Sequence, residues 1–381
     1  PMFNDLGLST SMFAGIYSLA TLCASLFLQP CGRLLDRYPI KPILLGMIAL
    51  MMIGCLLIAS STSIITLFFG FFIVRFIGQG AFGLAASTLV TKQFHKNRGK
   101  ALGIIMFGFP LSEIIYPFIA VFLLESLGWR EAYLLFACSF LIMIPIQLYF
   151  INRSQLSTGH FYPEETLIQP QRLTGSETKV TTIRHYTLKE TLKDISFYLA
   201  LLAATLPPVV MTGLFFHQSA LFEVQQWPIS YAAYGLMVYA IVKALGSIFI
   251  GPLIDTFGSG SFFTVMLALM GLGTYLAGLG GPWWMILVYL SCLGFALGIS
   301  APVMNHLWAS LYGTMHIGSI KGFISTFRNG LTGFGPLPLD MAMEKGIPLT
   351  LLLQYVAVAI VILMIIPIGL QLFDKRLSSQ S

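Results

Sequence analysis

The sequence has few charged residues. Asp, Glu, Lys and Arg make up 9% of its 381 residues, whereas a soluble globular protein has about 25%. So few charges cannot cover a folded surface of this size with polar groups. The hydrophobic residues, which are 56% of the chain, must therefore face lipid, and this excludes an ordinary soluble protein.

Cysteine and catalytic motifs are also scarce. The five cysteines lie in or beside apolar runs and lack metal-ligand spacing, so we interpret them as small buried hydrophobic residues. The sequence contains no nucleotide-binding motif, metal cluster or hydrolase triad. We therefore predict a protein that is not an enzyme, with no cofactor, no metal and no nucleic-acid partner.

Long apolar segments, by contrast, are plentiful. Eleven are long enough to cross a bilayer, and their Pro and Gly punctuation favours helices over a β-barrel. They lie at 9–29, 42–60, 64–90, 101–124, 132–151, 196–220, 230–250, 261–280, 284–307, 319–340 and 348–372. We predict an all-α membrane protein with an N-terminal bundle at 1–151, a linker at 152–195 and a C-terminal bundle at 196–381.

Positive charge predicts the orientation of these spans. Sixteen of the 21 lysines and arginines fall on the side that contains the linker, two fall on the opposite side, and three lie inside spans. Loops rich in Lys and Arg stay in the cytoplasm. We therefore expect the linker and the C-terminus to be cytoplasmic, and we predict the bacterial inner membrane as the location.

The chain contains an internal repeat. Gly32-Arg33-Leu34-Leu35-Asp36 matches Gly251-Pro252-Leu253-Ile254-Asp255. The same offset along the chain relates three further pairs, Gly99 and Gly318, Gly103 and Gly322, and Pro117 and Pro336. Two halves that repeat in parallel are typical of transporters. The counterpart of span 196–220 would fall before residue 1, so we expect twelve spans in the intact protein, with the first helix absent from this chain.

These motifs resemble those of the major facilitator superfamily. Gly32 to Arg37 is similar to the family's G-x-L-x-D-R/K loop, and Gly251 to Asp255 is similar to its second copy. Arg75-Phe76-Ile77-Gly78 resembles the fourth-helix R-x-x-x-G pattern with the glycine one place early, and Gly128-Trp129-Arg130 resembles the entry to the sixth helix. The resemblance implies two pseudo-symmetric bundles that alternate access. It also implies a gating role for Gly32, Asp36, Arg37, Gly251 and Asp255.

Ionisable residues inside the predicted spans indicate the charge of the solute. Arg75, Glu113, Lys243 and Arg328 lie near the middle of their spans, where each is costly unless it is paired or lines a cavity. Three cations and one carboxylate predict a cavity that attracts an anion. His217, toward the outer end of its span, is a weaker candidate for contacting substrate or relaying protons. In the alternative interpretation, Arg75 and Glu113 form a structural pair and Lys243 extends to the membrane surface.

This charge pattern resembles the branch of oxalate–formate exchangers and monocarboxylate porters, in which basic residues on the eighth and eleventh helices bind carboxylate. The resemblance assigns these roles to Lys243 and Arg328. Two departures are that Ser247 replaces the arginine common on the eighth helix, and that Arg328 replaces the lysine of oxalate exchangers.

We therefore predict a secondary or facilitative transporter of a small organic anion, working by uniport, proton symport or exchange with a counter-solute. Its predicted substrate-binding residues are Arg328, Lys243, Arg75 and His217. The alternative is a proton-coupled exporter of neutral, cationic or drug-like compounds, with Glu113 as the proton carrier. A non-transporting receptor or channel is the alternative of another class.

Overall fold

The computed structural model describes residues 5–6, 8, 10–94, 97–153, 185–228, 231–332 and 334–366. All regular secondary structure in these residues is helical, which confirms the predicted all-α fold. Each predicted span falls on one helix or on consecutive helices. Most of the predicted linker at 152–195 lies outside the described residues.

The chain forms two compact units, and each unit contains segments from both halves of the sequence. Unit 1 comprises Pro1–Lys92, Leu127–Lys193 and Trp308–Ser325. Unit 2 comprises Gln93–Ser126, Asp194–Leu307 and Thr326–Ser381. The two units thus exchange one segment each relative to a division at the linker. The division into bundles at 1–151 and 196–381 stays a prediction.

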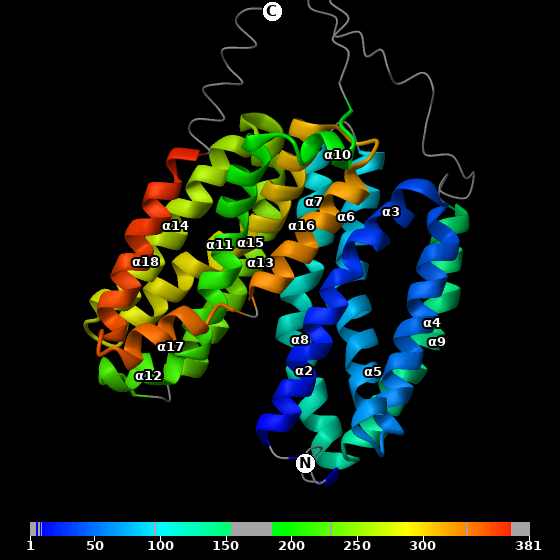
Figure 1. The fold of residues 1–381 in the computed structure, drawn as a ribbon, viewed down its shortest axis with the longest axis horizontal. Coiled ribbons are helices and arrows are strands. Elements are labelled where there is room, and N and C mark those ends of the chain that lie inside the picture. The colour runs from blue at the N-terminus through cyan, green and yellow to red at the C-terminus, as the bar shows by residue number, and fades with distance from the viewer. Residues whose placement is uncertain are drawn as a thin grey trace, which may run out of the picture. The chain divides into compact units, whose positions relative to one another are not determined.

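Unit 1 is built around α4 and α5. Its helices are α2 (Thr10–Leu26), α3 (Leu28–Arg37), α4 (Ile40–Ala59), α5 (Ile64–Val74), η1 (Arg75–Ala81), α6 (Phe82–Gln93), α9 (Trp129–Arg153) and α10 (Leu188–Thr191). Helix α4 packs against α5 and α9, and α2 packs against α5 (Figure 1). Ser63 begins α5 with a capping box, in which its hydroxyl accepts a hydrogen bond from the Thr66 backbone N–H.

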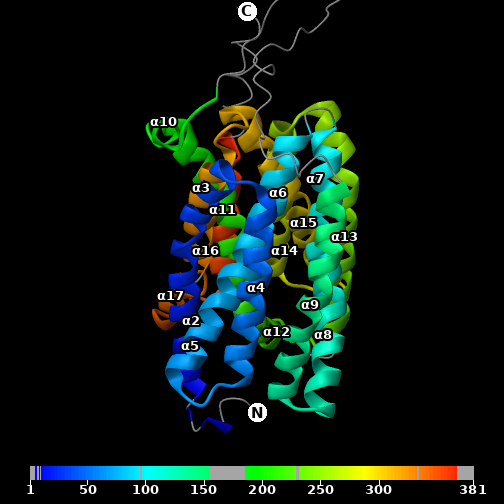
Figure 2. The ribbon, with the colours of Figure 1, turned by 90° about the vertical axis from the view of Figure 1, so that its right-hand side faces the viewer.

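Unit 2 is built around α13 and α14. Its helices are α7 (Arg98–Met106), α8 (Gly108–Ser126), α11 (Ile195–Phe216), α12 (Gln218–Val224), α13 (Tyr231–Phe257), α14 (Ser259–Leu279), most of α15 (Met285–Tyr312), α17 (Leu337–Glu344) and α18 (Leu349–Leu363). Helix α13 packs against α7 and α8 (Figure 2). Helix α14 packs against α18 (Figure 1). Helix α16 (Ile317–Thr332) is divided between the two units.

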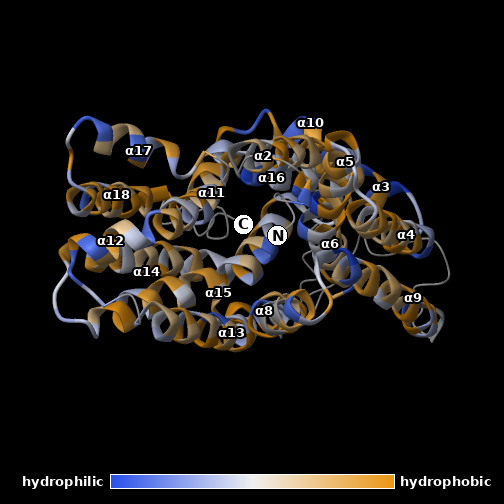
Figure 3. Ribbon diagram, turned by 90° about the horizontal axis from the view of Figure 1, so that it is seen from below, coloured by the Kyte–Doolittle hydropathy of each residue, from blue (hydrophilic) through white to orange (hydrophobic). Residues whose placement is uncertain are grey.

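The helices have the length and hydropathy of membrane spans. Nine helical segments in the described part of the chain are long and apolar enough to cross a membrane, and Leu349–Leu363 is a shorter apolar helix. Hydrophobic residues dominate α4, α9, α13 and α18 (Figure 3). Large apolar side chains such as Phe122 and Phe249 are more than half exposed, so they require an apolar surrounding. The protein is therefore an integral membrane protein, and the count of eleven or twelve spans stays a prediction.

The predicted span 319–340 is interrupted in the structure. Helix α16 ends at Thr332 and α17 begins at Leu337. Pro336 lies between them and has no backbone N–H to continue the helical hydrogen bonds. The interruption leaves Arg328 on one helix and Asp340 on the next.

Candidate functional site

Asp36, near the end of α3, caps the start of α16. Its Oδ1 accepts a hydrogen bond from the Gly318 backbone N–H at 2.9 Å, and its Oδ2 accepts bonds from the Ser319 N–H and hydroxyl, both at 2.6 Å. The first N–H groups of a helix lack partners within the helix and carry partial positive charge, so a carboxylate suits them. A Cβ on Gly318 would lie 2.6 Å from the Gly32 carbonyl oxygen, so this crossing requires glycine. We call this contact the Asp36 cap.

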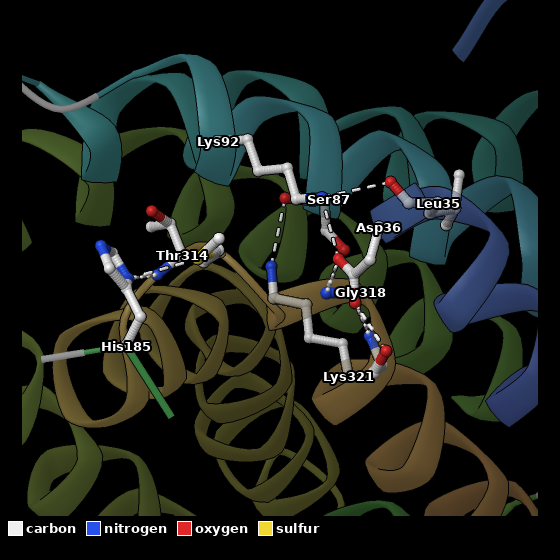
Figure 4. A network of polar contacts seen from close by, with 10 residues as sticks. Leu35, Asp36, Ser87, Lys92, His185, Thr314, Gly318 and Lys321 are labelled. Carbon is white, nitrogen blue, oxygen red and sulfur yellow. Dashed lines mark hydrogen bonds and ion pairs between the residues drawn. The ribbon is translucent and has the colours of Figure 1, made fainter. Parts of the chain in front are cut away.

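Two buried lysines surround the Asp36 cap (Figure 4). Lys92 Nζ lies 2.8 Å from Asp36 Oδ1 and donates to the Leu35 carbonyl at 3.1 Å. Lys321 is 3% exposed, and its Nζ donates to Thr91 Oγ1 at 2.7 Å. From the sequence, both lysines were predicted only as charges on the linker side. Their positions at the edges of predicted spans were the signal that they could be buried.

Arg37, the third gating candidate on α3, makes none of the contacts of the cap. It is exposed in the last turn of the helix and has no hydrogen bond or ion pair with any described residue. The charge partner of Asp36 is Lys92 instead.

Asp255 caps α7 in the same way. Its two carboxylate oxygens accept hydrogen bonds from the backbone N–H groups of Gly99 at 2.7 Å and Lys100 at 2.9 Å. A Cβ on Gly251 would lie 2.7 Å from the Gly99 carbonyl oxygen. Each of these residues is related to its counterpart in the Asp36 cap by the offset of the sequence repeat. The sequence repeat is therefore also a repeat of contacts, and we call this second contact the Asp255 cap.

Arg75 begins the π-helical segment η1 inside unit 1. Its Nε donates to Thr21 Oγ1 at 2.9 Å, and its guanidinium carbon lies 4.6 Å from the centre of the Tyr17 ring. Short π-helical segments often occur at functional sites. Arg75 has no carboxylate partner among the described residues of unit 1, and the alternative of an Arg75–Glu113 pair stays a prediction.

Glu113 pairs with Lys243 instead. Lys243 Nζ, from α13, lies 2.7 Å from Oε1 and 2.6 Å from Oε2 of Glu113 on α8. The Lys243 side chain is 16% exposed and that of Glu113 is 49% exposed. Lys243 therefore neither extends alone to the membrane surface nor stands as an unpaired cation. The packing of α13 against α8 brings the two charges together, which the order of the spans in the sequence did not reveal.

The surroundings of Arg328 differ from those of Arg75 and Lys243. It lies on α16, four residues before the helix ends at Thr332, and is exposed. It has no hydrogen bond or ion pair with any other residue in the part of the chain that the structure describes. Of the three predicted cations inside spans, Arg328 alone lacks a polar contact with the described residues.

His217 joins α11 to α17. This side chain is 6% exposed, with Nδ1 2.9 Å from the Gly213 carbonyl oxygen and Nε2 2.7 Å from Asp340 Oδ1. His217 was predicted from the sequence as a site residue, whereas Asp340 was not. An acidic residue at the end of the predicted span 319–340 was the available signal, and only the separate helix α17 explains its position.

Comparison with known proteins identifies the family. The sequence model of the Major Facilitator Superfamily matches residues 1–336. The chain belongs to the Major Facilitator Superfamily. No curated protein sequence matches it. As a superfamily member, the protein is a transporter of small solutes and not an enzyme, and the oxalate–formate or monocarboxylate branch stays a prediction.

Several solved transporters of the superfamily fold share its architecture. The human organic anion transporter MFSD10 (TETRAN) is 16% identical, with a TM-score of 0.67 over 96% of this chain and 86% of that chain. A bacterial homologue of the iron transporter ferroportin in an outward-facing state is 15% identical, with a TM-score of 0.69 over 97% and 92%. The E. coli fucose:proton symporter is 15% identical, with a TM-score of 0.68 over 96% and 92%. At such identities the likeness shows the fold alone.

Proposed function

We propose that this transporter carries a small organic anion, with a carboxylate as the preferred cargo, by alternating access. The observation that carries the proposal is that Arg328 has no polar partner among the described residues. A charged side chain in a membrane span is costly unless it is paired or lines a water-filled cavity. A bound carboxylate supplies the missing negative charge and matches the planar fork of the guanidinium.

The other ionisable residues in the spans support the same sign of charge. Lys243 and Glu113 neutralise each other. Arg75 is held by a hydroxyl and an aromatic ring, neither of which cancels its charge. Neither Arg75 in unit 1 nor Arg328 in unit 2 therefore has a carboxylate partner among the described residues, and each positive charge favours an anion.

The two caps supply the gate in this proposal. Each cap joins a helix end from one half of the sequence to the start of a helix from the other half. Alternating access requires such contacts to be made in one state and released in the other. We assign the gating role to Asp36 and Asp255, with Gly32 and Gly251 allowing the close helix crossings. The positive charge of the nearby loops supports a cytoplasmic position for both caps.

A second candidate is the proton-coupled exporter of neutral, cationic or drug-like compounds. The Glu113–Lys243 pair favours it, because protonation of the half-exposed Glu113 would release Lys243. A cationic cargo would, however, be repelled by Arg328, which has no carboxylate partner among the described residues. The similar solved structures do not select between the candidates, since they are described as an organic anion transporter, a homologue of the iron transporter ferroportin and a fucose:proton symporter.

A thermal-shift screen with matched ligands tests the cargo. Each small carboxylate is compared with its own amide, which has nearly the same shape and no charge. Ligand binding to the folded state stabilises it by RT ln(1 + [L]/Kd) and so raises the unfolding temperature. We expect carboxylates to raise the temperature and their amides to leave it unchanged. Stabilisation by cationic compounds with no response to any carboxylate would overturn the proposal in favour of the exporter.

A further inference from the structure

We propose that His217 and Asp340 form a proton-binding site that fastens α17 to the end of α11. Both nitrogens of the buried imidazole are in hydrogen-bond contact. Nδ1 faces the Gly213 carbonyl oxygen at 2.9 Å. A backbone carbonyl can only accept a hydrogen bond, so Nδ1 must carry a hydrogen and donate it.

The position of that hydrogen determines what Nε2 can do. In a neutral imidazole with hydrogen on Nδ1, Nε2 carries only a lone pair and is an acceptor. Nε2 lies 2.7 Å from Asp340 Oδ1, and an ionised carboxylate is also only an acceptor. Two facing lone pairs repel, so the contact requires one additional proton. This proton sits on Nε2, giving an imidazolium–carboxylate pair, or on Asp340, which then donates to Nε2. In both cases the bridge forms only with the proton bound.

The neighbouring elements leave Asp340 as the principal partner of His217. Helices α14 and α18, which contact α11, carry no charged side chain. On α13, whose Tyr239 ring packs against Phe215, the nearest cation along the helix is Lys243, which is paired with Glu113. The remaining charged groups on α12, on α17 and after α17 are Glu223, Glu344 and Lys345, and all three are exposed.

Close backbone packing holds the two partners at this distance. A Cβ on Gly213 would lie 2.8 Å from the Gly335 carbonyl oxygen, and a Cβ on Gly335 would lie 2.6 Å from the Val209 carbonyl oxygen. The last turns of α11 therefore lie directly against the segment that leads into α17. When the proton leaves, the bridge is lost and α17 is held by this packing and by its contact with α18.

The same segment connects the proton site to Arg328. Arg328 lies four residues before the end of α16, and residues 334–336 lead into α17. A change in the attachment of α17 therefore acts on the helix end that carries Arg328. This link to transport rests on the proposed anion function. It predicts that proton binding at His217–Asp340 and anion binding at Arg328 are coupled, as proton–anion symport requires.

Substitution of Asp340 distinguishes a proton-dependent bridge from an ordinary hydrogen bond. In Asp340→Asn, the amide N–H donates to Nε2 of a neutral imidazole, so the bridge forms without the additional proton. In Asp340→Ala, the bridge is absent at every pH. Glu344→Gln and Glu344→Ala on the same helix are the matched controls, because Glu344 is exposed and takes no part in the bridge.

The measurement is the unfolding temperature of the purified protein as a function of pH, from about 5 to about 9. We expect the wild type to exceed Asp340→Ala by several degrees at the acidic end, and this difference to vanish as the pH rises. Asp340→Asn should keep a constant advantage over Asp340→Ala at every pH. A wild-type advantage that does not change with pH, or an Asp340→Asn protein that matches Asp340→Ala, would overturn the proposal.

Nitrogen-15 NMR of histidine-labelled protein gives a second measurement that needs no Asp340 variant. The His217 signal is assigned by its loss in His217→Gln. We expect hydrogen on Nδ1 at every pH at which the bridge exists, and a change in the Nε2 shift when the bridge is lost. A His217 ring with bare Nδ1 throughout the titration would contradict the proton site. Neither experiment uses a substrate, so failure here would leave the anion proposal standing.

Discussion

Asp36 and Asp255 are equivalent residues of the internal repeat, and they cap two helices that also begin at equivalent residues, Ile317 and Arg98. The two caps differ in their surroundings. Asp36 is 7% exposed and is ion-paired with the buried Lys92, whereas Asp255 is exposed. Positions equivalent to Lys92 and Lys321 in the other copy of the repeat are leucines, Leu311 and Leu102. The geometry of the cap is therefore repeated, but only the Asp36 cap is accompanied by lysine side chains with little exposure.

Loss of the first cap should cost more stability than loss of the second. Asp36→Ala leaves Lys92 buried without its anion, and removing one partner of a buried pair costs about 3–5 kcal/mol. Asp255→Ala removes an exposed helix cap, which costs about 0.5–2 kcal/mol. Unfolding temperatures of the two variants should follow this order. The double variant Asp36→Ala/Lys92→Met should recover part of the loss, and equal effects at the two caps would contradict the asymmetry.

Loss of either cap should impair flux more than it impairs binding. A cap that holds one conformational state contributes to the balance between states and does not contact the solute. Removing about 1–2 kcal/mol from one state changes the ratio of states roughly five- to thirtyfold. Counterflow into proteoliposomes should therefore fall, while ligand binding by thermal shift persists. Unchanged flux in both Asp36→Asn and Asp255→Ala would exclude the gating role.

Glycine-to-alanine substitutions should destabilise the protein at close helix crossings but not at ordinary helix positions. Gly251→Ala places a methyl group 2.7 Å from the Gly99 carbonyl oxygen, and such crowding typically costs about 1–3 kcal/mol. Gly46→Ala is the matched control, since an added Cβ there meets no atom within 4 Å. In a helix, that change should be neutral or stabilising by about 0.5–1 kcal/mol. Similar unfolding temperatures for the two variants would mean that the α13–α7 crossing tolerates separation.

The Lys243–Glu113 pair should be measurable by a double-mutant cycle. Lys243→Met and Glu113→Gln alone each leave an unpaired group, whereas the double variant leaves none. Glu113 is half-exposed, so solvent screens the interaction and we expect a coupling of about 1 kcal/mol or less. Unfolding free energies of the four proteins give the coupling directly. Additive single effects would show that the observed contact contributes nothing to stability.

Much of the fold followed from hydropathy and the repeat. The long apolar segments predicted the helices, because only a helix satisfies its own backbone hydrogen bonds in lipid. The constant offset of the repeat also related Gly32 to Gly251 and Asp36 to Asp255 before any contact was known. The interruption between α16 and α17 was not predicted, since Pro336 in an apolar run is compatible with a kinked continuous helix.

Which charged residues pair with each other was harder to predict from the sequence. Glu113 lies closer to Arg75 along the chain than to Lys243, yet it bonds to Lys243. Partner choice depends on which helices pack together, and hydropathy does not encode this. Lys92, Lys321 and Asp340 were missed for a related reason: residues at predicted span ends look solvated until the packing of neighbouring helices buries or pairs them.

Substitutions of Arg328 should show the charge of the cargo. If Arg328 binds a carboxylate, Arg328→Gln should weaken carboxylate binding by about 1.5–3 kcal/mol, roughly ten- to a hundredfold, because it removes a charge-assisted hydrogen bond. Arg328→Lys should recover only part of this affinity, since lysine keeps the charge but loses the planar fork. The unfolding temperature without ligand should change little, because Arg328 has no polar partner among the described residues.

Glu113→Gln completes this comparison, because the two candidate functions predict opposite results for it. If the cargo is an anion, the variant should bind carboxylate as well as or more tightly than the wild type, since the one opposing carboxylate is neutralised. If the protein is a proton-coupled exporter, the variant should lose proton-driven flux and retain exchange. Both can be measured on the same proteoliposomes, with and without an imposed pH gradient. Export of a cationic compound that depends on Glu113 and is indifferent to Arg328→Gln would exclude the anion transporter.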